Sequence, residues 1–180
     1  FHHIAYQALT ICNALSMERL EATVRRAGLK PGAAVMDIGC AYGEVSIHLA
    51  RAFDARVTAV ELDPVMAEGA KARIAAAGLS DRITLRRETS AAVLAALPAF
   101  DLIVAIGSTE PAGKGLRDPA AVFAALRQHL TPGGALLWGD LFWTDEPPPP
   151  LRQLVETGGY YVSHDEWQAA AREAGLTGVS

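Results

Sequence analysis

The sequence predicts an α/β fold in which a doubly wound, mainly parallel sheet carries helices on both faces. Short apolar runs alternate along the chain with segments of helical periodicity. Such an alternation implies parallel strands joined by right-handed crossovers. The chain has 180 residues, of which 51% are hydrophobic, and this suits one domain with a substantial core.

Composition and charge exclude several classes of protein. The formal net charge of −4 disfavours a broad phosphate-binding face, so we expect no nucleic-acid partner. No apolar run approaches the roughly 20 residues that a membrane span needs, and no secretory leader is visible. Cys12 and Cys40 are too few for a disulfide framework or a metal cluster, which favours a reduced, cytoplasmic setting.

The first elements are helical. Ser16 can cap a helix over residues 16–27, which Gly28 ends. Further upstream, apolar residues indicate another helix near the ligand crevice: Tyr6, Leu9 and Ile11. We therefore divide the chain into an N-terminal helical segment that covers the crevice (1–30) and the main domain (31–180).

A strand over residues 33–38 runs through a small-residue turn into a helix over residues 43–53. In an open parallel sheet, ligands bind in the crevice past the carboxyl ends of the strands. Glycines in this turn let the backbone approach a ligand, and the helix start offers unpaired N–H groups. The turn therefore predicts a seat for a nucleotide-type cofactor. The glycines here are Gly39 and Gly43 with Ala41 between them, so the dinucleotide fingerprint G-x-G-x-x-G fails at its second and third glycines.

The second strand, residues 56–61, ends in Glu61. Glu61 lies 22 residues beyond Gly39, close to the roughly 20-residue interval at which Rossmann-type folds place a ribose-binding acid. A carboxylate at a strand end accepts hydrogen bonds from both ribose hydroxyls, and we favour this role over a solvated charge. Asp63 then caps a helix that runs to about residue 77.

The remaining elements continue the alternation. Strands are predicted over residues 82–86, 100–106, 135–139 and 176–180, with a turn at 131–134. Helices are predicted from about 90 to 98, from 119, and from Ser163, which forms a capping box with Glu166. The loop over residues 107–115 leaves the sheet at the crevice edge, where loops carry chemistry more often than the scaffold does. The prolines at 147–150 predict an extended segment that serves as a wall or lid.

The stretch Val35-Met36-Asp37-Ile38-Gly39-Cys40-Ala41-Tyr42-Gly43 resembles motif I of the class I S-adenosylmethionine-dependent methyltransferases. Only the central glycine departs from that motif, replaced by Ala41. The turn at residues 13–16, Phe-Asp at 100–101 and Pro-Gly-Gly at 132–134 are also similar to the family. The resemblance covers residues 13–180. It implies a Rossmann-like, mainly parallel seven-stranded sheet whose last antiparallel hairpin is missing from this chain.

The resemblance implies S-adenosylmethionine as the cofactor. Residues 39–43 would pack against its methionine part, Glu61 would hold the ribose and Leu62 would flank the adenine. The family's adenine-binding aspartate falls on Thr89 here, with Glu88 one step earlier, and which of the two serves stays open. The cofactor-binding residues implied in this way are Asp37, Gly39, Cys40, Ala41, Gly43, Glu61, Leu62, Thr89, Ser90 and Ile106. No metal is implied.

No residue is marked by the sequence as a catalytic base. The candidates, in order, are His164, Glu110, Tyr160 and His48. For both histidines a structural or solvated role is the favoured interpretation. We expect the acceptor pocket to be formed by Tyr6, the 107–115 loop and a set of aromatic residues. An equally weighted alternative is that the aromatic residues fill the core. That set is Phe142, Trp143, Tyr160 and Tyr161.

Three functions remain open at this point. The favoured one is transfer of a methyl group to a small-molecule acceptor by in-line displacement, with a homodimer as a possible assembly. A second is a non-catalytic S-adenosylmethionine-binding partner or regulatory protein. The third, disfavoured by the incomplete glycine fingerprint, is an NAD-dependent oxidoreductase.

Overall fold

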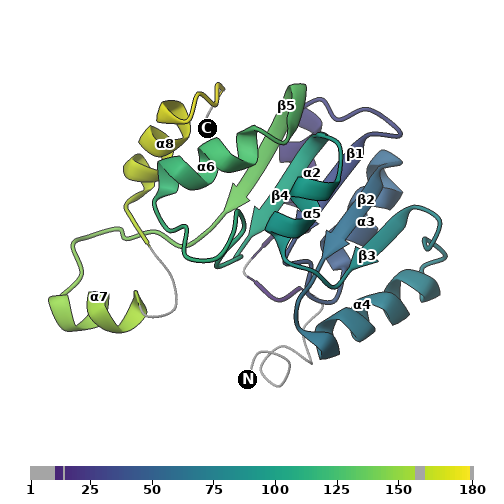
Figure 1. The fold of residues 1–180 in the computed structure, drawn as a ribbon, viewed down its shortest axis with the longest axis horizontal. Helices are drawn as coiled ribbons and strands as arrows, with labels where there is room; N and C mark the ends of the chain where they lie inside the picture. The colour runs from purple at the N-terminus through teal and green to yellow at the C-terminus, as the bar shows by residue number, and fades with distance from the viewer. Residues whose placement is uncertain (1–10, 14, 157–160, 179–180) are drawn as a thin grey trace.

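The computed structural model describes residues 11–13, 15–156 and 161–178. Five parallel strands form one sheet in the order β3-β2-β1-β4-β5 (Figure 1). The strands are β1 (Ala34–Ile38), β2 (Arg56–Val60), β3 (Ile83–Arg86), β4 (Phe100–Ile106) and β5 (Leu130–Gly139). The helices are α2 (Met17–Arg26), α3 (Glu44–Phe53), α4 (Pro64–Ala76), α5 (Ser90–Ala96), α6 (Pro119–Arg127), α7 (Pro149–Val155) and α8 (His164–Glu173). The predicted α/β class and the predicted parallel order of elements are confirmed.

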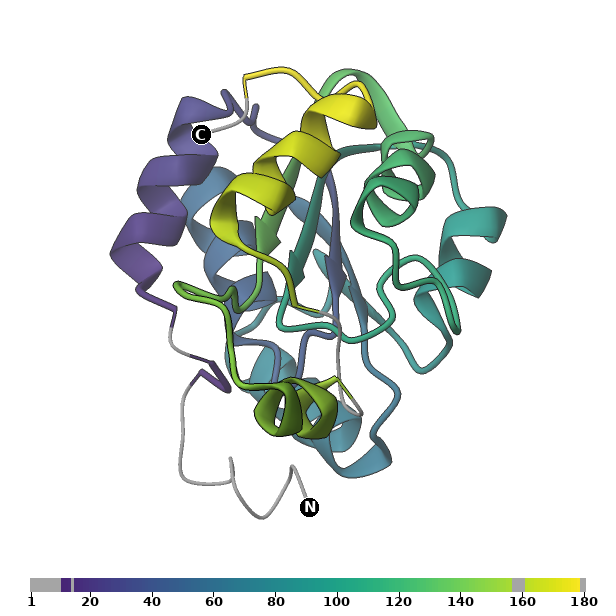
Figure 2. The same ribbon diagram turned by 90° about the vertical axis from the view of Figure 1, so that its left-hand side faces the viewer.

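Helices cover both faces of the sheet. Figure 2 shows α2 and α3 on one side of the strands and α5 and α6 on the other. The first layer packs on Val35 and Val104 in the main core cluster, which also takes in α4. The second packs on Met36 and Ile103, and α8 joins α6 on that side through Phe123. Because β1 and β4 are covered on both faces, they read as nearly continuous apolar runs, interrupted by Asp37 in β1 and Asp101 in β4.

Strand β5 begins earlier than the sequence predicts. Leu130 already pairs with Phe100, whereas the next aligned pair joins Ala135 to Leu102. The Pro-Gly-Gly stretch therefore lies in a bulge within β5 and not in a turn before it. A side chain at Gly134 would place its Cβ only 2.9 Å from the Phe100 carbonyl oxygen, so the bulge needs glycine there.

The sheet of the described residues has five strands and ends at β5, so neither the sixth strand predicted over residues 176–180 nor a seven-stranded sheet is confirmed. Residues 176–178 follow α8 without strand structure, and 179–180 lie outside the described residues. The proline run is extended only in part. Pro148 keeps an extended backbone with φ −54° and ψ 139°, whereas Pro149 and Pro150 begin α7, because proline is tolerated in the first turn of a helix, where its missing N–H would have no partner. Whether this segment serves as a wall or lid stays a prediction.

The N-terminal helix α2 is confirmed, with Ser16 Oγ accepting the Arg19 N–H at 3.4 Å. Leu20 and Val24 of α2 belong to the main core, so this helix forms part of the layer beside α3. Residues 1–10, with Tyr6 and Leu9, lie outside the described residues. Whether the first residues cover the crevice therefore stays a prediction. In the described part of the chain, no helix has the length and apolar character for a membrane crossing.

Candidate functional site

The turn after β1 is built from residues in left-handed backbone conformations. Gly39, Ala41 and Gly43 have φ values of 71°, 48° and 83°. The Gly39 and Cys40 N–H groups both donate to the Val60 carbonyl, at 2.9 and 3.0 Å. Gly39 is exposed, and a Cβ there would lie 3.6 Å from the Ser108 side chain. The turn is thus tied to the end of β2 and lies directly beside the loop that follows β4.

Glu61 connects two loops at the carboxyl edge of the sheet. Its Oε2 accepts the Ala41 N–H at 2.9 Å, and its Oε1 accepts the Asp63 N–H at 2.8 Å. A carboxylate offers about four lone-pair positions, so each oxygen retains acceptor capacity for a ligand hydroxyl. The carboxylate predicted from sequence spacing is therefore fixed at the crevice and still able to accept hydrogen bonds.

Asp37 lies beneath this turn and is only 3% exposed. Its Oδ2 accepts the Ser46 hydroxyl at 2.6 Å, which joins β1 to the first turn of α3. Burial raises the pKa of Asp37 to about 6; the Ser46 hydrogen bonds oppose this rise, and the nearby charge of Glu61 adds to it. Such burial favours a supporting role for Asp37, and its contact with the cofactor stays a prediction.

Four further predicted cofactor residues line or support the same edge. Cys40 is buried, and burial raises the pKa of its thiol well above the usual value, which favours the neutral thiol. Gly43 caps α3, and a Cβ there would meet Ala70 of α4 at 3.4 Å. Ile106 ends β4 beside Gly139. The Leu62 side chain is 59% exposed, which leaves its apolar surface open to a flat ring.

The residues after β3 are engaged in local hydrogen bonds. Thr89 caps α5, its hydroxyl accepting the Ala92 N–H at 3.2 Å. Ser90 is buried and donates to the Glu110 carbonyl at 3.3 Å, while Glu88 pairs with Arg86 at 2.7 Å. These bonds give Thr89 and Ser90 structural roles. Their expected contact with the adenine edge stays a prediction.

The proposed bases are placed differently from one another. The Glu110 carboxylate stabilises its own loop, because it accepts a hydrogen bond from the Gly115 N–H at 3.0 Å. The His48 Nε2 lies 3.1 Å from the Glu21 carboxylate, so this imidazole joins α3 to α2. His164 begins α8 and is exposed, with its ring centroid 5.4 Å from that of Phe142. Tyr160 lies outside the described residues.

Sequence reasoning missed Asp140, which directly follows β5 at the carboxyl edge. It is half-buried, and burial raises the pKa of its carboxyl group, opposed by a hydrogen bond from the Leu141 N–H at 2.8 Å. Burial also raises the pKa of Tyr161, and the charge of Asp140 adds to that rise. The signal was available, because an acid directly after a strand is also what singled out Glu61.

A cavity of about 380 Å³ lies at the opposite, amino edge of the sheet, lined by residues 27–33 and 131–135. There Asp101 accepts the Ala34 N–H and the Thr131 hydroxyl, both at 2.9 Å. Both bonds stabilise strand starts. Because ligands of open parallel sheets bind at the carboxyl ends, we place the site by its polar groups and not by this cavity.

Residues 35–134, more than half of the chain, match the methyltransferase domain family. The chain belongs to this family. The resemblance to class I S-adenosylmethionine-dependent methyltransferases is thereby confirmed. The matched region spans β1 to the bulge of β5, and so contains Glu61 and the glycine turn of this methyltransferase domain.

The methyltransferase domain is similar in sequence to several curated proteins. The chain is 31% identical over 163 residues to the 27-O-demethylrifamycin SV methyltransferase of Amycolatopsis mediterranei (strain S699), and the match covers 86% of this chain and 58% of that protein. The chain is also 31% identical over 152 residues to the ubiquinone biosynthesis O-methyltransferase of Xanthomonas campestris pv. campestris (strain B100), and this match covers 84% of this chain and 59% of that protein. The chain thus spans less than two thirds of the length of these relatives.

A solved structure with bound S-adenosyl-L-homocysteine resembles the domain along almost its whole length. The S-adenosylmethionine-dependent methyltransferase of Thiobacillus denitrificans, in complex with S-adenosyl-L-homocysteine, superimposes with a TM-score of 0.77 at 26% identity. The match covers 96% of this chain and 69% of that one.

Proposed function

We propose that this domain binds S-adenosylmethionine at the carboxyl edge of its sheet and transfers the methyl group to a small-molecule acceptor by in-line displacement. The observation that carries the proposal is the carboxylate of Glu61, fixed by two backbone N–H groups beside an open glycine turn. The family membership and the S-adenosylhomocysteine complex of the Thiobacillus denitrificans relative support it.

The residues present fit this cofactor. Glu61 has acceptor capacity for two ribose hydroxyls, and the exposed Leu62 offers an apolar surface for the adenine. The exposed Gly39 lets the backbone approach the methionine part, and Asp37 supports the turn from below. When bound, S-adenosylmethionine supplies a methyl group that is already activated by its sulfonium. The chain then contributes orientation, which can lower a barrier by about 7–11 kcal/mol.

We propose Asp140 as the group that accepts the proton of a hydroxyl acceptor. It is half-buried at the end of β5, and its raised pKa brings it closer to the operating pH, where a general base works best. It therefore joins His164, Glu110, Tyr160 and His48 among the candidates. Of these four, Glu110 and His48 already have structural partners.

Asp140→Asn is expected to lower kcat/KM at least a hundredfold, the lower part of the range for loss of a general base. The dissociation constant for S-adenosylmethionine is expected to stay within twofold, because Asp140 lies two strands away from β1. Asp145→Asn, an exposed carboxylate a few residues further on, is the matched control and should retain activity. If Asp140→Asn turns over normally, another group or water accepts the proton of the hydroxyl acceptor.

Titration calorimetry with S-adenosylmethionine, S-adenosylhomocysteine and NAD tests the cofactor assignment. We expect heat with the first two and none with NAD. Heat with NAD alone would instead favour the oxidoreductase. Methyl release against a panel of metabolites then separates an enzyme from a non-catalytic binding protein. The homodimer, the cytoplasmic location and the absence of a nucleic-acid partner stay predictions, and light scattering checks the first of these.

A further inference from the structure

Helix α4 contains a glycine in its interior, Gly69, although alanine at such a position makes a more stable helix. The backbone does not require glycine there, because Gly69 has no positive φ. The space beside it does. A Cβ at this position would lie 2.6 and 2.8 Å from two ring carbons of Tyr42, which is well inside van der Waals contact. Gly69 therefore leaves a notch in α4 that the ring of Tyr42 fills.

The ring of Tyr42 is also held by Arg73, one helical turn further along α4. The Arg73 guanidinium carbon lies 4.7 Å from the ring centroid, within the range of a favourable cation–π contact. Arg73 in turn forms an ion pair at 3.2 Å with Glu44, the first residue of α3. Only 9% of Tyr42 is exposed. The residue is thus fixed against α4 by its side chain as well as by its backbone.

The backbone on both sides of Tyr42 is left-handed, with a φ of 48° at Ala41 and 83° at Gly43. Glycine adopts this conformation readily, whereas alanine is strained in it and keeps it only where the surroundings impose it. One restraint on Ala41 is the hydrogen bond from its N–H to Glu61 at 2.9 Å. The other is the fixed position of Tyr42, the next residue in the chain. If the ring moved, Ala41 could relax towards a negative φ, which would change the turn that Glu61 is bonded to.

We propose that Tyr42 is a positioning residue for the cofactor. Its ring, seated in the Gly69 notch and held by Arg73, keeps Ala41 left-handed before any cofactor is bound. The turn then has its binding shape in advance, and the cofactor loses no affinity by imposing that shape. The proposal rests on the proposed function, because it concerns the cofactor site assigned there. It deepens that function by naming the side chains that act on the site through the turn.

Variants of the ring and of its notch test this role, with the Kd for S-adenosylmethionine measured by titration calorimetry well below the unfolding temperature. Tyr42→Leu removes the ring but keeps an apolar side chain, and the Kd should rise about tenfold. Tyr42→Phe keeps the ring and should stay within about twofold of wild type. Gly69→Ala leaves Tyr42 in place but fills its notch, so the Kd should rise about fivefold. This variant decides the question even if Tyr42→Leu does not fold.

Two comparisons show whether the loss of affinity comes from the ring in its notch. Phe53→Leu makes the same change in another buried ring, which ends α3 and lies 5.4 Å from the Arg25 guanidinium carbon. It should lower stability and leave the Kd unchanged. The double variant of Tyr42→Leu and Gly69→Ala should bind within about twofold of the weaker single variant, because both changes disrupt the same contact.

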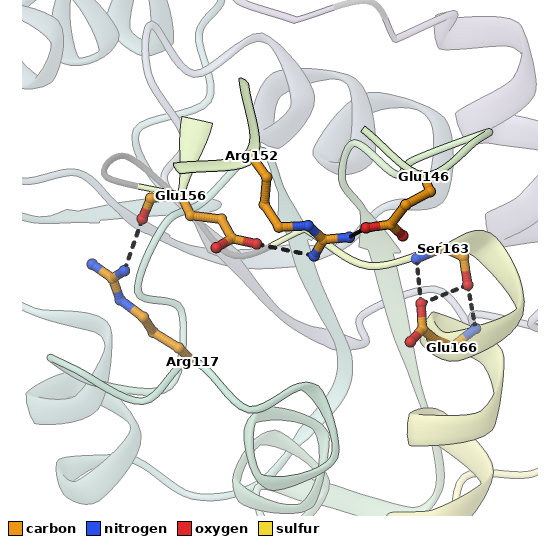
Figure 3. A network of polar contacts seen from close by, with 6 residues as sticks. All are labelled: Arg117, Glu146, Arg152, Glu156, Ser163 and Glu166. Carbon is orange, nitrogen blue, oxygen red and sulfur yellow. Dashed lines mark hydrogen bonds and ion pairs between the residues drawn. The ribbon is translucent and has the colours of Figure 1, made fainter. Parts of the chain in front are cut away.

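A pair of arginine variants tests the contribution of the cation. Arg73→Ala removes the guanidinium beside Tyr42, and the Kd for S-adenosylmethionine should rise about threefold. Arg152 is the matched arginine, because it also forms ion pairs, with Glu146 and Glu156 in the network of Figure 3. Arg152→Ala should leave the Kd unchanged.

Three results would overturn the positioning role. If Tyr42→Leu and Gly69→Ala unfold at lower temperature but bind S-adenosylmethionine as tightly as wild type, the ring supports the fold alone. If Tyr42→Phe binds as weakly as Tyr42→Leu, the hydroxyl and not the ring in its notch is responsible. If the wild type itself gives no heat with S-adenosylmethionine, the proposed function is wrong and the positioning role falls with it. The first two results leave the proposed function intact, so the two failures are distinguishable.

Discussion

Glu61→Ala is expected to weaken S-adenosylmethionine binding about a hundredfold, equivalent to about 2.8 kcal/mol. The variant removes the acceptor proposed for the ribose hydroxyls. It also leaves the Ala41 and Asp63 N–H groups without their carboxylate partner, which loosens the turn beside the crevice. A donor left unsatisfied on burial costs about 1–3 kcal/mol. Titration calorimetry measures the loss of affinity, and thermal unfolding measures the loss of stability.

Two further variants make this result interpretable. Glu61→Gln keeps one oxygen that can accept a backbone N–H, but it presents an amide NH₂ group to the other backbone N–H. We therefore expect a smaller loss of affinity for S-adenosylmethionine than in Glu61→Ala. Glu21→Ala removes a carboxylate of α2 whose partners are Arg25 and His48 and not the glycine turn, and should leave affinity unchanged. If Glu61→Ala binds the cofactor as tightly as the wild type, the ribose assignment is wrong.

The strand ends were predictable because a parallel sheet places them at one edge. An apolar run that ends in an acid fixes both the strand and the position of the acid, as Glu61 shows. The glycine turn was predictable for a similar reason, since left-handed backbone is read from glycine. Ala41, with a φ of 48°, is the exception that glycine content alone would miss. These features depend on backbone geometry, which local sequence determines well.

Side-chain partners were less predictable, because they depend on contacts between distant segments. Thr89 is used as a helix cap, and His48 pairs with Glu21 from another helix. No sequence interval indicates that second contact. The position of Asp140 directly after β5 could have been predicted, but its burial, and hence its raised pKa, depends on how the segment after β5 packs. The bulge in β5 likewise depends on pairing with β4.

Asp37→Asn is expected to change the pH dependence of stability by about 3 kcal/mol, the free energy that corresponds to a pKa of about 6 in place of the ordinary 3.8. Below about pH 3.8 the carboxyl group is protonated in both the folded and the unfolded chain. Between 3.8 and about 6 only the folded chain keeps the proton, so stability falls as the pH rises through this window. Above about pH 6 the group is ionised in both states and the full cost persists.

Asparagine resembles the protonated form, so the stability of Asp37→Asn relative to wild type should rise between pH 3.5 and pH 7. Urea unfolding at a series of pH values measures this difference. Asp54 is an exposed carboxylate paired with Arg82, so Asp54→Asn is the control. Its stability relative to wild type should change by less than about 1 kcal/mol over the same pH range. Ser46→Ala removes a donor that favours the ionised carboxylate, so it should raise the pKa of Asp37 and move the upper end of the window to higher pH. If the difference in the free energy of unfolding between wild type and Asp37→Asn stays constant across the window, the pKa of Asp37 is not raised in the folded chain. The aspartate beneath the turn would then be ionised, and the hydrogen bonds from Ser46 would stabilise its charge.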